Sequence, residues 1–158
     1  MNLKSLTYIF LTIFVTISCS VEENSFNKVS WSLSEGVKFP EGNRLSRAED
    51  GVMLADGTLI VADQRYGLAK IDLIGNVIPF GDFEALNYEH NPPKVESGPN
   101  GVHLTPDKKY VITADVFNGK IYKTSIEDNF TEIIYAHKYG ANTAREDSTG
   151  SIWFTQST

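Results

Sequence analysis

Cysteine is almost absent from this chain, whose 158 residues contain a single one, Cys19. Because there is no second cysteine, an intramolecular disulfide is excluded, and the fold must be stabilised by packing or by a bound ion. The 3 histidines, His90, His103 and His137, lack the spacing of zinc ligands and have no cysteine pair to join them. We therefore interpret each of them as a surface or strand residue.

A surplus of basic residues is also lacking. The chain has 14 Lys and Arg against 20 Asp and Glu, a net charge of −6, which gives no electrostatic reason to bind nucleic acid. It contains neither a glycine-rich phosphate loop nor a Gly-x-Ser-x-Gly nucleophile elbow, so the sequence does not support a serine hydrolase. Its apolar content of 41% is enough to bury one domain core.

Long hydrophobic runs are missing as well. The most apolar stretch, residues 6–17, is too short to cross about 30 Å of hydrocarbon as a mature helix, but after Lys4 it is typical of an export signal. Residues 16–19 (TISC) resemble the lipobox of bacterial lipoproteins, in which Cys19 becomes the lipidated first residue, although Thr16 stands where an aliphatic residue is usual. The alternative is an ordinary signal peptide cut near Ser18 or Ser20, which leaves a soluble periplasmic protein.

These features predict a signal peptide over residues 1–19 and a polar tether over residues 20–30. We expect the protein to be exported to the cell envelope, in the periplasm or at the outer membrane. Its contact with the membrane is expected to be through the lipid anchor only.

One structural plan is repeated along the rest of the chain. Its clearest copy, residues 97–115, consists of a small-residue turn, a short apolar strand, a tight turn at residues 105–107 and a second strand over residues 110–114. Two other copies cover residues 49–63 and 142–155. Each copy therefore predicts a pair of antiparallel strands.

Two more strand-sized segments follow each of the first two copies. They cover residues 67–72 and 77–80 in the first case, and residues 119–124 and 130–135 in the second. A period of about 40 to 50 residues, with about four short strands per unit, is typical of β-propeller blades. We predict an all-β fold, a partial β-propeller over residues 31–158, with blades near residues 49–80, 100–135 and 142–158.

Three short motifs stand at the start of the three copies: residues 48–52 (AEDGV), 99–102 (PNGV) and 140–142 (GAN). With the strand pattern, they resemble the SMP-30/gluconolactonase superfamily, which includes gluconolactonases, paraoxonase-type lactonases and strictosidine-synthase-like proteins. The resemblance covers residues 45–158. It implies a six-bladed propeller that holds a divalent cation, usually calcium, in its central channel.

The chain accounts for about two and a half of these six blades, because six blades of about 45 residues need roughly 270 residues. We therefore expect the sequence to be a truncated part of a longer chain, with the remaining metal ligands in the missing part. A chain that stops after an incomplete blade would leave the edge of its last strand unpaired. Self-association of partial propellers is the alternative.

Glu49, Asn100 and Asn142 stand at matching places in the three copies and carry side-chain oxygens, the ligands that a hard cation such as Ca²⁺ prefers. In a propeller, the segment before each innermost strand points at the axis, so these side chains should converge. The resemblance implies that Glu49 and Asn142 bind the metal and that Asn100 contacts the substrate. Paraoxonase-type members place a catalytic histidine where Asn100 stands, and an amide is not a general base. The sequence identifies no residue for that role.

Backbone roles are the alternative for several of these residues. Asparagine and glycine in turns often serve positive φ angles, and Asp50 is well placed to cap a turn. Asp63 and Asp115 end matching strands, and we interpret them as structural. The aromatic residues at alternating strand positions are predicted to pack between sheets: Tyr110, Trp153 and Phe154.

The predicted function is a divalent-metal-dependent hydrolysis of a small lactone or related sugar-derived ester. Ca²⁺ or another divalent cation would polarise the carbonyl group while a carboxylate assists the attacking water. Two alternatives stay open. The first is a non-catalytic propeller that binds a glycan, peptide or partner at the cell envelope, and the second is a strictosidine-synthase-like activity on the same scaffold.

Overall fold

The computed structural model describes residues 39–42, 44–90 and 97–156, which belong to one compact unit, Val37–Thr158. The predicted signal peptide, the lipobox with Cys19 and the tether lie outside the described residues. Within the described part of the chain, no helix is long and apolar enough to cross a membrane.

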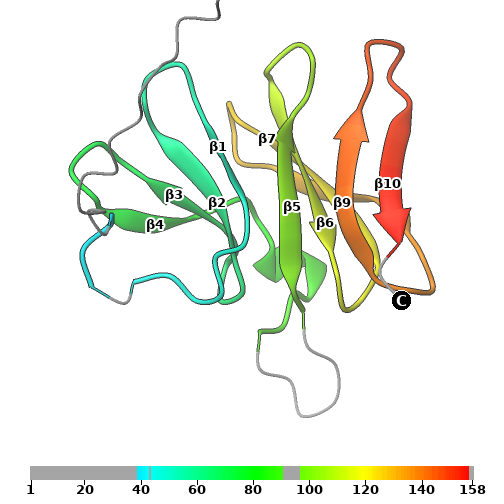
Figure 1. Ribbon diagram of the computed structural model, residues 1–158, viewed down its shortest axis with the longest axis horizontal. Helices are drawn as coiled ribbons and strands as arrows, with labels where there is room; N and C mark the ends of the chain where they lie inside the picture. Colours follow the sequence, from blue (N-terminus) through cyan, green and yellow to red (C-terminus); the bar gives the residue numbers. More distant parts are fainter. Residues whose placement is uncertain (1–38, 43, 91–96, 157–158) are drawn as a thin grey trace, which may run out of the picture. The chain divides into compact units, whose positions relative to one another are not determined.

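The described residues form antiparallel sheets that follow one another along the chain (Figure 1). The first sheet has the order β1-β2-β3-β4, with β1 at Gly51–Met53, β2 at Leu59–Asp63, β3 at Gly67–Ile71 and β4 at Val77–Phe80. The second has the order β5-β6-β7-β8, with β5 at Pro99–Leu104, β6 at Tyr110–Asp115, β7 at Lys120–Ser125 and β8 at Thr131–Ala136. A third sheet pairs β9 (Ala141–Glu146) with β10 (Ile152–Gln156).

The predicted all-β class is confirmed, and the succession of antiparallel sheets is propeller-like. Between the first two sheets, the chain forms a short 3-10 helix, η1 (Glu84–Leu86). No sequence pattern predicts this helix, because a single turn is too short to show a helical periodicity.

The turns within the three repeated strand pairs are stabilised by the same kind of hydrogen bond. Each contains an aspartate whose Oδ1 accepts a backbone N–H two residues ahead: Asp56 from Thr58 (2.9 Å), Asp107 from Lys109 (3.0 Å) and Asp147 from Thr149 (2.8 Å). Such side-chain contacts replace the backbone partners that a tight turn leaves without a bond. The predicted turns therefore form where the sequence places aspartate.

Two cores lie on the two faces of the second sheet. Val111 on β6 packs into a cluster with Ile60 and Leu68 of the first sheet, whereas Ile112 packs with Ala144 of the third. Because successive side chains of a strand point to opposite faces, β6 contributes to both cores. Burying each large aliphatic side chain contributes roughly 1.5–3 kcal/mol, so β6 joins the three sheets together.

Asp63 and Asp115 are structural, as predicted. Both side chains are fully buried at the ends of β2 and β6, where their carboxylates accept backbone N–H groups of adjoining loops. Asp63 accepts from Ser46 at 2.6 Å, and Asp115 accepts from Gly98 at 3.0 Å. Each carboxylate thus fixes the segment that leads toward the first strand of its sheet.

The prediction for Trp153 was wrong. Its side chain is 68% exposed, and its indole N–H donates to Asp147 Oδ2 at 2.7 Å across the β9–β10 turn. Phe154, the next residue, points to the other face and packs against the core that contains Ala144. Alternation along β10 therefore assigns one aromatic residue to the core and the other to the surface.

Candidate functional site

The first strands of the three sheets, β1, β5 and β9, lie next to one another in space, in the same order as in the sequence. Contacts join β1 to β5 and β5 to β9, and Figure 1 shows β5 (lime) beside β9 (orange). Residues at the start of these strands therefore come from distant parts of the sequence and lie along one row.

The strand registers place Glu49, Asn100 and Asn142 at equivalent positions. Each stands two residues before a residue that pairs with the second strand of its sheet: Gly51 with Val61, Val102 with Thr113, and Ala144 with Phe154. In the second and third sheets the register shifts next to the asparagine, so both asparagines sit in an irregular, bulged part of the strand. The three residues that occupy matching places in the sequence repeat therefore also occupy matching places in the strand pairing.

Asn100 and Asn142 are in direct contact. Asn100 Nδ2 donates to Asn142 Oδ1 at 2.7 Å and lies 3.2 Å from the backbone oxygen of Asn142. Neither residue has a positive φ, so the backbone alternative does not account for asparagine here. The contact leaves Asn100 Oδ1 available to a ligand, together with a second lone pair on Asn142 Oδ1.

Glu49 does not join this pair through a hydrogen bond. Its Oε1 lies 3.4 Å from Arg47 Nε, and both side chains are partly exposed. This surface ion pair is weak because water screens it, and only one of the two carboxylate oxygens takes part. The carboxylate therefore keeps an oxygen that is free to bind a cation.

Asp50 joins the first two sheets. Its Oδ1 accepts the N–H of Gly51 at 2.8 Å, and its Oδ2 accepts the N–H of Val102 on β5 at 2.9 Å. The predicted backbone role is confirmed, and the second bond extends it from a local cap to a contact between sheets. Asp50 is thus held in place beside the middle of β5.

His103 and Thr143 form a pair that the sequence analysis missed. His103 Nε2 lies 2.7 Å from Thr143 Oγ1, which connects β5 to β9. Burial lowers the pKa of His103, and the positive charge of Arg145 lowers it further, while the negative charge of Asp50 opposes both effects. No local sequence pattern indicates this pair, because it depends on how β5 and β9 meet.

The three side chains carry oxygen donors, the type of ligand that a hard cation prefers. Glu49, just before β1, offers a carboxylate, and Asn100 on β5 and Asn142 on β9 offer amide oxygens. Such oxygens suit Ca²⁺ better than a softer metal. Among the described residues, no group of three or more His, Cys, Asp or Glu side chains is arranged to hold a metal. A cation at this place would therefore depend on amide oxygens as well as on Glu49.

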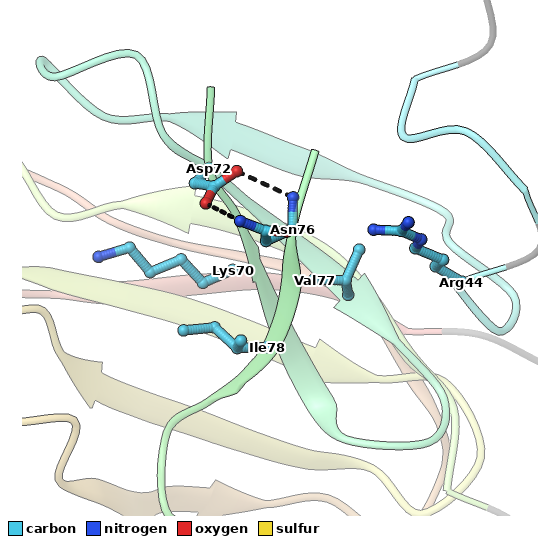
Figure 2. A pocket seen from close by; sticks show the side chains of 6 residues that line it. All are labelled: Arg44, Lys70, Asp72, Asn76, Val77 and Ile78. Carbon is cyan, nitrogen blue, oxygen red and sulfur yellow. Dashed lines mark hydrogen bonds between the residues drawn. The ribbon is translucent and has the colours of Figure 1, made fainter. Parts of the chain in front are cut away.

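A separate hollow lies on the outer strands of the first sheet. It has a volume of about 440 Å³ and is lined by side chains of β3, β4 and the turn between them, together with Arg44 (Figure 2). Asp72 accepts the side-chain amide of Asn76 at 2.7 Å, as the dashed lines in Figure 2 show, and Arg44 donates to the backbone oxygen of Gly75 at 3.0 Å. None of the predicted site residues lines this hollow, so the two sites are independent.

Neither a scan against protein-family models nor a search of curated proteins found a match to this chain. What the site does must therefore be inferred from its own residues.

Proposed function

We propose that this chain forms blades of a β-propeller that hydrolyses a small lactone or related sugar-derived ester at the cell envelope, with Ca²⁺ or another divalent cation as cofactor. The observation that carries the proposal is the set of oxygen-bearing residues at equivalent positions of the three sheets, Glu49 just before β1, Asn100 on β5 and Asn142 on β9. Two of them, Asn100 and Asn142, are already in contact.

In this proposal, Glu49 and Asn142 hold the cation through their oxygens, and Asn100 orients the substrate. When bound, the cation would polarise the lactone carbonyl group and stabilise the negative charge that develops on its oxygen. The Asn100 amide has both a donor and an acceptor, so it can bind a ring oxygen or a hydroxyl group of a sugar-derived substrate. Its contact with Asn142 keeps it beside the metal ligand.

The test is hydrolysis of a sugar lactone, followed by acid release, in the presence of Ca²⁺ and after chelation. We expect hydrolysis that is lost with chelator and restored by Ca²⁺. The Asn142→Ala variant should lower kcat/KM by about 100-fold, the scale expected when an electrostatic contact to the reacting group is removed.

Asn76→Ala is the matched control, because it removes the same side chain from the hollow in Figure 2 and leaves the first strands untouched. It should retain wild-type activity. Hydrolysis that is insensitive to chelator, or an equal loss in both variants, would refute the proposed function.

A further inference from the structure

A second hollow lies where the turns of the first two sheets meet. It has a volume of about 490 Å³, and most of its lining is apolar: Met53, Leu54, Ala55, Leu104 and Ile126. Met53 and Leu104 are the last residues of β1 and β5, whereas the glutamate and the asparagine of the candidate metal site stand before β1 and near the start of β5. The hollow is therefore a different site.

Part of this lining belongs to the hydrophobic core. Leu54, Leu104 and Ile126 are partly buried and pack against the cluster that joins the first two sheets. Met53 is 66% exposed, and a methionine side chain is flexible enough to adapt to apolar partners of different shapes. A hydrocarbon chain in the hollow would remove apolar surface from water on both molecules, which is the main source of affinity for such a ligand.

Two charged residues, Asp56 and Lys108, also line the hollow. Asp56 Oδ1 accepts the backbone N–H of Thr58 at 2.9 Å. Hydrogen bonds from Thr58 are the main cause of the lowered pKa of Asp56, and the positive charge of Lys70 adds to it. Asp56 therefore has its partners within its own sheet. Lys108 forms no ion pair with the described residues.

The backbone fixes the position of Lys108. Its φ is 60°, and its N–H donates to the backbone oxygen of Thr105 at 2.8 Å. The backbone oxygen of Lys109 accepts the N–H of Ile126 at 2.9 Å, which ties this turn to the apolar lining. Lys108 and Ile126 also line an adjoining hollow of about 280 Å³, together with Lys109 and Glu127. The two lysines outweigh the one glutamate, so a positive charge lies beside the apolar part.

We propose that the hollow binds a medium-chain carboxylate, with its hydrocarbon chain on the apolar lining and its carboxylate at Lys108. A volume of about 490 Å³ lies in the range of small-molecule sites. The net charge of −6 repels anions from the protein as a whole, so this local arrangement must supply the attraction. The inference is independent of the proposed function.

The experiment titrates the purified protein with hexanoate, octanoate and decanoate, and with 1-octanol, at one ionic strength and below the concentrations at which they aggregate. Binding is followed by the NMR shifts of the Leu104 and Ile126 methyl groups. We expect the affinity to rise about fourfold with each added CH₂ group, which corresponds to about 0.8 kcal/mol. Octanoate should bind more tightly than octanol, because only octanoate has a charge for Lys108.

Two variants separate the charge from the chain. Lys108→Gln should weaken octanoate binding about fivefold and leave octanol binding unchanged, since an exposed ion pair contributes at most about this factor. Met53→Ser should weaken the binding of both ligands, because it removes apolar lining. Met53 is largely exposed, so this variant should keep its fold.

Lys138→Gln is the matched control. Its ammonium lies 4.5 Å from the ring centre of Tyr139, in the segment between β8 and β9, and it does not line the hollow. It should bind octanoate as wild type does. The proposal is refuted by an absence of saturable shifts, by an affinity that does not depend on chain length, or by equal weakening in Lys108→Gln and Lys138→Gln. If octanol binds as tightly as octanoate, the hollow does not select a carboxylate, and the proposal is wrong.

Discussion

Asp115 shows how one buried carboxylate organises its surroundings. It is fully buried at the end of β6, and its Oδ1 accepts backbone N–H groups from Gly98, Phe117 and Asn118 at 2.9–3.0 Å. These bonds favour the charged form, but the loss of hydration on burial outweighs them and raises the pKa of Asp115. Ionising the residue that fixes the start of β5 therefore costs stability.

The sign of the resulting pH dependence follows from linkage. Because the native pKa lies above the unfolded value of 3.8, the native state binds this proton more tightly. The contribution of Asp115 to stability is fully present below about pH 4 and is lost as pH rises through its native pKa. We predict that Asp115→Asn removes this loss, so that the unfolding free energy of the variant rises relative to wild type between pH 4 and pH 7. Urea unfolding at several pH values measures the unfolding free energy of both proteins. A difference between variant and wild type that stays constant from pH 4 to pH 7 would contradict the prediction.

The approach of β5 to β9 is set by a residue without a side chain. A Cβ at Gly101 would lie 2.5 Å from Thr143 Oγ1 and 2.6 Å from Thr143 Cα, closer than atoms in van der Waals contact. A larger residue must therefore move the two strands apart. Both cross-strand pairs, Asn100–Asn142 and His103–Thr143, depend on this spacing.

We predict that Gly101→Ala destabilises the protein by about 1–3 kcal/mol and weakens Ca²⁺ binding, because the strands must separate. Gly150→Ala is the control. Its Cβ meets nothing within 4 Å, but its φ of 84° strains any other residue, so it should lower stability without changing Ca²⁺ affinity. Thermal unfolding and calorimetry on the two variants separate the effects. Equal Ca²⁺ affinities in both would show that the spacing is not needed for binding.

The sequence predicted strands and turns well because both depend on local rules. Alternating apolar residues and turn aspartates such as Asp56 and Asp107 act within a few residues of their own positions. The pairing of Glu49 with Arg47 and of His103 with Thr143 could not be predicted, since such contacts depend on side-chain direction or on how two sheets meet. The exposure of Trp153 was missed for a related reason, because periodicity does not say which face of a strand is covered.

Across the three sheets, packing and the site share the same strands. The second sheet contributes Val111 to one core and Ile112 to the other, and its first strand carries Asn100 and His103 between the neighbouring sheets. Glu49 lies just before β1 and Asn142 lies on β9, and β1 and β9 both contact β5. Glu49, Asn100 and Asn142 stand at equivalent positions of the three sheets. If they form the proposed metal site, the protein binds a divalent cation.

Calorimetric titration of the purified protein with Ca²⁺ tests that consequence most directly. We predict a single-site isotherm for wild type and at least a tenfold weaker affinity for both Glu49→Ala and Asn142→Ala, a loss of about 1.4 kcal/mol or more. Glu84→Ala, on the exposed surface of η1, should bind as wild type does. An absence of binding heat, or an affinity unchanged in Glu49→Ala and Asn142→Ala, would contradict the metal site.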